Sequence, residues 1–268
     1  MTSGPALGNV RIVLCDTSHP GNIGATARAM KTMGLTDLAL VRPAAFPHPQ
    51  AETRASGATD VLAAARTHAS LESALADVGF AVALSARVRD LGPPETSVRG
   101  GAAQAVALAA TQRVAFVFGG ERVGLDGRDA SRCHAIARIP SDPGFGSLNV
   151  AAAVQVVAYE LRMASLAVGE PAARAVDGHD PLADGTAIEQ LVAAFQRTMT
   201  RTGYLVPERP GRLDRRLRRL FSKARMQQSE VKILRGFLQS VDERVQPADA
   251  VADAFSAGVP CADPSGGN

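Results

Sequence analysis

Short apolar runs alternate with longer amphipathic stretches over the first two thirds of the chain. Five runs of four to six residues are rich in Val, Leu, Ile, Ala and Phe, which is typical of buried strands; they are 10–15, 38–41, 80–85, 114–118 and 135–139. Helical spacing of apolar positions marks 21–34, part of 52–62, 71–78, 102–110 and 148–168. Strands that are apolar on both faces favour a parallel sheet covered by helices, so the pattern predicts an α/β fold.

The composition changes after residue 168. Gly, Pro, Ala and Asp without any period fill 169–185, which predicts a linker. Three amphipathic helices are then expected at 188–199, 212–225 and 229–241. We therefore expect an α/β domain over 1–168, a linker over 169–185, a small basic helical extension over 186–245 and a disordered tail over 246–268.

The composition also narrows the class of protein. The 268 residues suffice for one sizeable domain and an appendage, and 46% of them are hydrophobic. We see no secretory leader and no apolar run that we expect to span a membrane, so we expect a cytoplasmic protein. Cys15, Cys133 and Cys261 are few and widely spaced, which argues against disulfides and against a metal site.

The positive charge is concentrated in one segment. Residues 197–235 hold 12 Lys and Arg against three Asp and Glu, whereas 1–196 carry a net charge of −2 and 236–268 carry −4. Such a segment is either a solvated helical face or a surface that binds nucleic acid. Trp is absent and aromatic residues make up only 4%, which argues against an aromatic platform for stacking bases.

A strand end, a Gly/Pro-rich loop and a helix start follow one another in residues 139–160. Ser147 or Asn149 occupies the position where a helix needs a cap. Backbone donors and the helix dipole converge at such a junction, so it can hold a polar or anionic ligand group. The alternative is a buried helix with an ordinary cap.

Three motifs lie where strands give way to helices. They are NIGATAR at 22–28, FGGERVGL at 118–125, and the pair IP and SLNVA within 139–151. No dinucleotide fingerprint follows a strand and no phosphate-binding P-loop occurs, which disfavours a Rossmann dehydrogenase or a kinase. The G-x-S-x-G motif of many hydrolases is also absent.

Together and in this order, the three motifs resemble those of the SpoU/TrmH branch of the SPOUT RNA methyltransferases, over about residues 8–168. The resemblance implies a parallel α/β fold with a C-terminal trefoil knot and a homodimer. It also implies transfer of a methyl group from S-adenosyl-L-methionine to a ribose 2′-hydroxyl. FSKAR at 221–225 and ILRGFL at 233–238 resemble the extension of the bacterial TrmJ-type subgroup, which methylates position 32, the first nucleotide of the tRNA anticodon loop.

The resemblance assigns roles to individual residues. It implies a cofactor site formed by Leu84, Ser85, Ala86, Gly119, Ile139, Gly146, Ser147 and Leu148. It implies catalytic roles for Arg28, Asn22, Glu121, Ser147 and Asn149. We expect Arg28 to hold the phosphate beside the target ribose, because arginine is effectively never deprotonated. Glu121 either pairs with Arg28 or caps the turn that follows it.

Basic residues on the first helix and in the extension are candidates for RNA contacts. They are Arg28, Lys31, Arg212, Arg215, Arg216, Arg218, Arg219, Lys223 and Arg225. The sequence leaves three alternatives open: a tRNA methyltransferase, a ribosomal RNA methyltransferase, and an RNA-binding protein of the same fold without catalysis. It also leaves open the base at the target ribose and the group that finally takes the proton.

Overall fold

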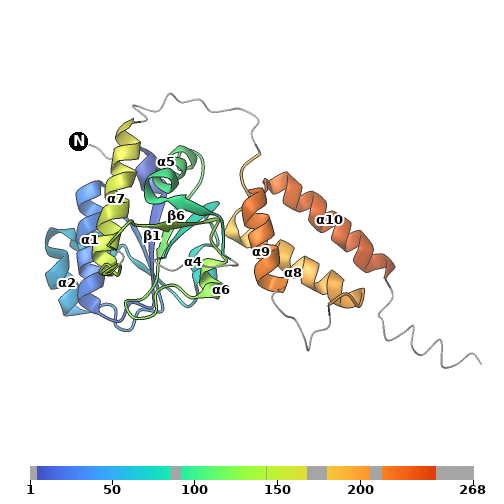
Figure 1. The fold of residues 1–268 in the computed structure, drawn as a ribbon, viewed down its shortest axis with the longest axis horizontal. Coiled ribbons are helices and arrows are strands. Elements are labelled where there is room, and N and C mark those ends of the chain that lie inside the picture. The colour runs from blue at the N-terminus through green and yellow to red at the C-terminus, as the bar shows by residue number, and fades with distance from the viewer. Residues whose placement is uncertain (1–4, 86–91, 143, 168–179, 206–212, 246–268) are drawn as a thin grey trace, which may run out of the picture.

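The computed structural model describes residues 5–85, 92–142, 144–167, 180–205 and 213–245. A seven-stranded sheet with the order β3-β2-β1-β6-β4-β7-β5 forms its centre, and every pair of neighbouring strands is parallel. The strands are β1 Val10–Cys15, β2 Asp37–Val41, β3 Arg66–His68, β4 Phe80–Leu84, β5 Glu95–Ser97, β6 Val114–Phe118 and β7 Ala135–Arg138. Figure 1 shows the sheet between helices, with three further helices at one side. The predicted α/β class is confirmed.

Ten α-helices and two short 3-10 helices occur among the described residues. The α-helices are α1 Pro20–Met33, α2 Pro49–Ala55, α3 Thr59–Ala63, α4 Leu71–Ala74, α5 Val98–Leu108, α6 Gly127–Ala130, α7 Val150–Ala167, α8 Gly185–Arg201, α9 Leu213–Ala224 and α10 Gln228–Arg244. The 3-10 helices are η1 Pro5–Asn9 and η2 Ser56–Ala58. The ends of α1 follow from its sequence, because Pro20 suits a first turn and Gly34 adopts a left-handed C-cap with φ 83°.

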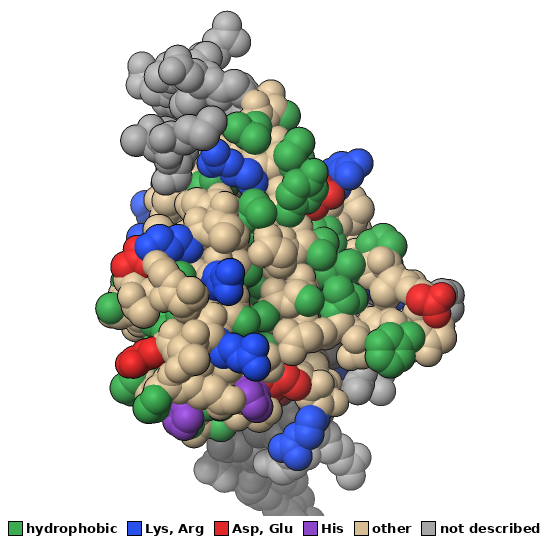
Figure 2. Space-filling view, turned by 90° about the vertical axis from the view of Figure 1, so that its left-hand side faces the viewer, with side chains coloured by type: hydrophobic (Ala, Val, Ile, Leu, Met, Phe, Trp, Pro, Cys, Tyr) green, Lys and Arg blue, Asp and Glu red, His purple; other side chains and the backbone are tan. Residues whose placement is uncertain are grey.

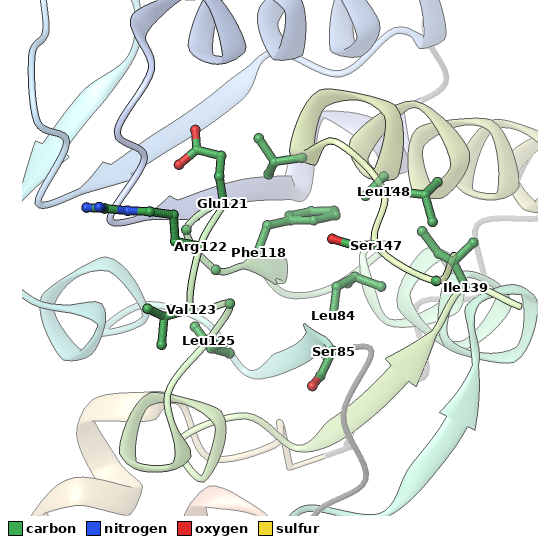
Figure 3. Close-up of a pocket in the computed structure, with 16 residues that line it drawn as sticks. Leu84, Ser85, Phe118, Glu121, Arg122, Val123, Leu125, Ile139, Ser147 and Leu148 are labelled. Carbon is green, nitrogen blue, oxygen red and sulfur yellow. The ribbon is translucent and has the colours of Figure 1, made fainter. Parts of the chain in front are cut away.

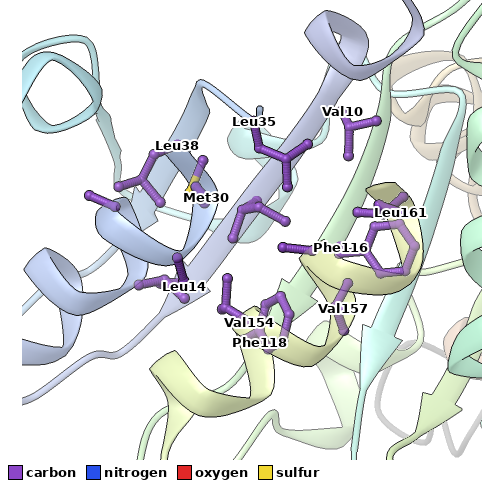
Figure 4. Close-up of a cluster of buried hydrophobic side chains, with 14 of the residues drawn as sticks. Val10, Leu14, Met30, Leu35, Leu38, Phe116, Phe118, Val154, Val157 and Leu161 are labelled. Atoms are coloured by element: carbon purple, nitrogen blue, oxygen red, sulfur yellow. The ribbon is translucent and has the colours of Figure 1, made fainter. Parts of the chain in front are cut away.

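Alternate strand residues pack into two cores, one on each face of the sheet. On β1, Ile12 and Leu14 face the larger core beneath α1, α5 and α7 (Figure 4), whereas Val13 and Cys15 face the smaller core beneath α4 and α6. Both faces are apolar because both are covered, as the continuous apolar runs indicated. The trefoil knot implied by the resemblance stays a prediction.

Helix α7 lies across the larger core. By length and composition alone it could cross a membrane. However, Val154, Val157 and Leu161 have no exposed surface and pack within the core that α7 shares with α1 and α5. Packing in the protein core therefore explains why the face of α7 that carries these three residues is apolar.

The apolar pattern of the sequence did not predict two edge strands, β3 and β5. Each has three residues, and the polar side chains of Glu95, Thr96 and Ser97 in β5 are exposed or half-buried. An edge strand bonds to one neighbour and buries little side-chain surface, so no apolar run marks it.

Helices α8, α9 and α10 share a core of their own that includes Leu191, Leu217, Phe221, Val231 and Leu238. Residues 180–185, within the expected linker, also pack here, since Ala183 N donates to the Met226 carbonyl at 2.7 Å. Residues 168–179 and the expected tail at 246–268 lie outside the described residues. The division into domains stays a prediction.

The extension docks beside the amino ends of β4 and β7. Gly185 N donates to the Val78 carbonyl at 3.0 Å, and Ser222 Oγ donates to the Cys133 carbonyl at 3.2 Å. Val78 precedes β4 and Cys133 precedes β7. The contact is thus made through backbone groups as well as side chains.

His134 lies at this contact. Burial and, secondarily, the charge of Arg225 lower the pKa of His134 to about 4. Its Nδ1 accepts a hydrogen bond from Ala81 N at 3.1 Å, and its ring centroid lies 5.7 Å from that of Phe80. The neutral imidazole is therefore the form that the folded protein stabilises.

We predict that folding stability falls as the pH is lowered from about 6.5 to 4. The unfolded chain protonates His134 near its ordinary pKa, whereas the folded chain does not, so acid favours unfolding. Between pH 7 and pH 5 this histidine should contribute a loss of about 1–2 kcal/mol. Urea denaturation of wild type and His134→Asn measures it, because Asn keeps an acceptor for Ala81 N. Parallel pH profiles for the two proteins would contradict the assignment.

Candidate active site

A pocket of about 310 Å³ opens at the carboxyl ends of the central strands (Figure 3). Its walls come from the ends of β4, β6 and β7, the loop between β6 and α6, and the first turns of α7. The lining residues are Leu84, Ser85, Phe118, Gly119, Gly120, Glu121, Arg122, Val123, Gly124, Leu125, Ile139, Gly146, Ser147, Leu148, Val150 and Ala153. This edge is where parallel α/β sheets bind ligands.

The pocket contains seven of the eight expected cofactor residues. The eighth, Ala86, lies outside the described residues. Most of the lining is apolar, and Ser85 and Ser147 add hydroxyl groups to it. A mainly apolar pocket with a few polar groups is typical of sites for small molecules of this size.

The loop at 119–125 folds tightly back on itself. A Cβ on Gly119 would lie 1.9 Å from Leu125 N, and a side chain cannot be accommodated there. Gly124 has φ 69°, a left-handed conformation that favours glycine. Gly124 N donates to the Gly120 carbonyl at 2.8 Å and closes the turn. The glycines thus form one wall of the pocket from backbone.

A chain of hydrogen bonds connects the three sequence motifs. Asn149 Nδ2 donates to Asn22 Oδ1 at 2.9 Å, and Asn22 Nδ2 donates to Glu121 Oε1 at 2.7 Å. Asn149 Oδ1 also accepts from Ala151 N at 2.9 Å, so Asn149 rather than Ser147 caps α7. The start of α7, the first turn of α1 and the pocket loop are thereby held together.

Glu121 is ionised and held by donors from the segment before α1. Ser18 donates to Oε2 through both N and Oγ, each at 2.9 Å. Burial opposes the charge, but the hydrogen bonds from Ser18 and Asn22 outweigh it and lower the pKa of Glu121 to about 2. Glu121 therefore bonds to Ser18 and Asn22, and the pair with Arg28, one of the two alternatives, does not form.

Arg28 lies two turns along α1 from this network. Its side chain is exposed, and it makes no hydrogen bond or ion pair with any described residue. Lys31, one turn further on, bonds to Asp60 and to the Gly57 carbonyl, both at 2.8 Å. Of these two expected RNA contacts, only Arg28 has a guanidinium or ammonium group without a partner inside the described chain.

The basic residues of the extension also differ in whether their side chains are paired within the protein or exposed. The Arg218 side chain is 9% exposed and forms ion pairs with Glu189 and Asp214, so its charge is used within the protein. Arg225 lies over the Phe80 ring, with Cζ 5.9 Å from the centroid. Arg216 and Lys223 are exposed, Arg215 and Arg219 are half-buried, and Arg212 lies outside the described residues.

Sequence reasoning singled out Asn22 but not Ser18, which also donates to Glu121, and it missed several pocket residues. Ser18 directly precedes the His-Pro pair that starts α1, and no spacing rule marks it. Phe118, Arg122, Val123 and Leu125 belong to the quoted motif at 118–125 but were given no role. Their position within that motif was the signal available.

The comparisons with known proteins agree with this fold. The model of the SpoU rRNA methylase family matches residues 9–159, and that of the tRNA methyltransferase TrmJ C-terminal domain matches residues 186–250. A tRNA (cytidine/uridine-2′-O-)-methyltransferase TrmJ from Klebsiella pneumoniae is 44% identical over 241 residues, covering 89% of this chain and 98% of that protein. The protein of the same name from Escherichia coli K12 is 43% identical over 238 residues, covering 89% and 97%.

Solved structures show the same similarity. TrmJ from Z. mobilis ZM4 has a TM-score of 0.75 at 32% identity, covering 87% of this chain and 98% of that one. A probable methylase family protein from Haemophilus influenzae Rd KW20 has a TM-score of 0.58 at 36% identity, covering 89% and 98%. The fold, the family model and these relatives define an α/β protein of the methylase class. The chain belongs to the SpoU methylase family and, through its extension, to the TrmJ branch of that family.

We predict that Asn149 contributes more to stability than an ordinary helix cap. Asn149→Ala should lower the free energy of unfolding by at least the loss of about 1 kcal/mol typical of a cap, because Asn22 Oδ1 also loses its donor. Asn149→Asp retains the cap acceptor, replaces that donor with an acceptor and adds a negative charge. Ser97→Ala, which removes the cap of α5 at Gly100 N, is the control. Equal losses for Asn149→Ala and Ser97→Ala in denaturant titrations would contradict the prediction.

Proposed function

We propose that this protein transfers a methyl group from S-adenosyl-L-methionine to a ribose 2′-hydroxyl of tRNA, at nucleotide 32 of the anticodon loop. The observation that carries the proposal is the pocket itself. The family resemblance implies eight cofactor residues, and seven of them line one cavity of about 310 Å³. These seven come from segments that are tens of residues apart in the sequence. The exposed guanidinium of Arg28 lies on the helix whose first turn joins this site.

The residues present fit this cofactor. The apolar side chains suit an adenine ring, and the backbone wall at Gly119 permits the close approach that a side chain would block. The hydroxyl of Ser147 is available to the polar tail. When bound, the cofactor supplies an electrophilic methyl group on a sulfonium, so the protein needs no metal for the transfer. Among the described residues, no group of three or more His, Cys, Asp or Glu could hold a metal ion.

Arg28 acts on the RNA in this proposal. A guanidinium can bind a phosphate through two parallel hydrogen bonds, and it stabilises negative charge that develops on the attacking oxygen. It does not remove the proton, because an arginine side chain is effectively never deprotonated in a protein. Glu121 and the two asparagines fix the first turn of α1. Because Arg28 lies on the same helix, they also fix the orientation of its side chain toward the RNA.

The substrate class rests on the relatives and the extension. The relatives of 43–44% identity are named as tRNA methyltransferases that act on cytidine and uridine, and the match includes the C-terminal domain at 186–250. Methylation of transcripts that differ only in the base at position 32 tests both the site and the base. Modification of ribosomal RNA and not of tRNA would favour the ribosomal alternative. A tRNA substrate accords with a cytoplasmic protein.

The extension contributes phosphate contacts in this proposal. Arg216 and Lys223 are exposed on α9 and make no hydrogen bond or ion pair with a described residue. Arg218 takes no part, because its charge is paired with Glu189 and Asp214. The positive segment is thus a surface for RNA only at the positions that its internal ion pairs leave available.

The protein acts as a homodimer in this proposal. On α7, Tyr159, Met163 and Leu166 are 49%, 44% and 60% exposed at the spacing of one helical face. Figure 2, viewed from the side on which α1, α2 and α7 lie, shows hydrophobic side chains gathered beside Lys and Arg. A contiguous apolar face on an otherwise polar surface is typical of a subunit interface.

We predict that Arg28→Ala lowers turnover by roughly 10²–10³-fold, the effect of losing one oriented donor in the transition state. Cofactor affinity, measured by calorimetry, should remain unchanged. Arg28→Lys keeps the charge without the planar fork and should recover turnover only in part. Ser147→Leu should give the opposite pattern, with weak cofactor binding in a folded protein. Near-normal turnover of Arg28→Ala would remove Arg28 from the mechanism.

A further prediction concerns the salt dependence of tRNA affinity. If Arg216 and Lys223 each neutralise a phosphate, replacing both by Gln should reduce the slope of log affinity against log salt by roughly 1.4–1.8, at 0.7–0.9 per contact. The pair Arg66→Gln and Arg99→Gln removes the same charge elsewhere and should leave the slope unchanged. Equal slopes for the two double variants would mean that α9 does not contact the RNA.

Another prediction concerns assembly. Met163→Asp introduces a charge into the apolar face of α7 and should yield a folded monomer in sedimentation experiments. Ile233→Asp alters a side chain on α10 that is 69% exposed and should leave the dimer intact. A dimeric Met163→Asp protein would exclude this face as the interface.

A further inference from the structure

Arg42 connects the ends of two neighbouring strands to the helix that follows the pocket loop. Its Nε and Nη2 donate to the two carboxylate oxygens of Asp16, both at 2.8 Å, and Nη2 also donates to Asp129 at 2.9 Å. Asp16 directly follows β1, Arg42 directly follows β2, and Asp129 lies in α6. A planar guanidinium shared by two carboxylates fixes their orientation as well as their separation.

The backbone at this ion pair adopts a conformation that residues with side chains seldom take. Asp16 has φ 55° and Arg42 has φ 50°, so both lie in the left-handed region. Backbone bonds hold the two turns side by side: Asp16 N donates to the Val41 carbonyl at 2.9 Å, and Ala44 N to the Thr17 carbonyl at 3.0 Å. Such strained turns persist only where their surroundings hold them, and they concentrate at functional sites.

The turn at Asp16 supports Glu121 in two ways. Ser18, two residues further on, provides two of the hydrogen bonds that the Glu121 carboxylate accepts. In addition, a Cβ on Gly120 would lie 2.6 Å from the Asp16 carbonyl oxygen, so the backbone before Glu121 rests directly on this turn. A rotation at Asp16 would therefore move both the donors and the segment that carries the carboxylate.

The second carboxylate connects the clamp to the other end of the pocket loop. Asp129 is 8% exposed, and its N donates to Asp126 Oδ1 at 2.7 Å in the cap of α6. Leu125 lies just before this cap and lines the pocket. Arg42 thus joins the segment before α1 to the helix in which the loop at 119–125 ends.

We propose that Arg42 is a positioning residue for methyl transfer. By holding Asp16 and Asp129, it keeps the turn at 16–19 and the loop at 119–125 in the arrangement that orients Glu121, and through Glu121 it orients Asn22. Arg42 does not line the pocket, so it acts through these residues. This inference rests on the proposed function, since it concerns the geometry of the same site.

The test compares Arg42→Ala with Arg66→Ala in the full chain. Arg66 pairs with Asp37 at 2.9 Å, at the opposite end of β2, and is the matched control. Turnover of tRNA at saturating cofactor should fall roughly 10- to 100-fold in Arg42→Ala, the effect of a small misplacement of catalytic groups. The loss should appear in kcat, and the KM for tRNA should change by no more than about twofold, because Arg42 does not contact the substrate in this proposal. Arg66→Ala should retain wild-type turnover.

Two further measurements distinguish positioning from a general loss of stability. Hydrogen exchange at the Ser18 and His19 amides should accelerate in Arg42→Ala and not in Arg66→Ala, because both amides donate to Glu121. Arg42→Ala combined with Glu121→Gln should lose no more turnover than Glu121→Gln alone, since both changes disrupt the same hydrogen bonds. Asp16→Asn, which removes the charge at constant size, should reproduce the pattern if Arg42→Ala does not fold.

Unchanged exchange at Ser18, turnover of Arg42→Ala equal to that of Arg66→Ala, or losses that multiply in the double variant would each overturn the inference. Failure of the proposed function appears separately, as a wild-type protein that transfers no methyl group to tRNA. In that case faster exchange at Ser18 in Arg42→Ala still supports the role of Arg42 in positioning Glu121.

Discussion

The chain of hydrogen bonds from Asn149 through Asn22 to Glu121 is the constraint on which the rest of the site depends. Its two bonds join residues 127 and 99 positions apart in the sequence. Each asparagine acts as donor and acceptor at once, whereas the carboxylate only accepts. The hydrogen bonds therefore run in one direction and end at Glu121. Caps, loop and helices at the pocket therefore form a single unit whose members cannot move independently.

Close packing of backbone supports this unit. A Cβ on Gly24 would lie 2.0 Å from the Ala51 carbonyl, so α1 approaches α2 as closely as glycine allows. On the other side of the site, the backbone at Gly119 approaches Leu125 N just as closely. Because the interior is close-packed, neither segment can adjust to an added side chain without displacing its neighbour. The pocket is thus preformed by steric limits as well as by hydrogen bonds.

The sequence predicted those features that depend on the periodicity of apolar residues and on the order of motifs along the chain. Buried strands such as β1 and β6 were found at their observed bounds because burial on both faces leaves a continuous apolar run. Seven of the pocket residues were implied by the family resemblance that three motifs at strand ends carry. Ser18, which donates to Glu121, was not predicted, since a backbone donor such as Ser18 N cannot be recognised from composition or spacing. Likewise a run of arginines cannot reveal that Arg218 is paired and buried whereas Arg216 is exposed.

The position of the extension bears on the size of the substrate. Its contacts with Val78 and Cys133 lie at the amino ends of β4 and β7, whereas the pocket lies at their carboxyl ends. The five residues of β4 span about 16 Å at 3.3 Å per residue. The pocket and these contacts of the extension are therefore separated by about the length of that strand. If one substrate occupies the pocket and also contacts α9, as proposed above, it must bridge this separation, which a folded RNA does and a free nucleoside does not.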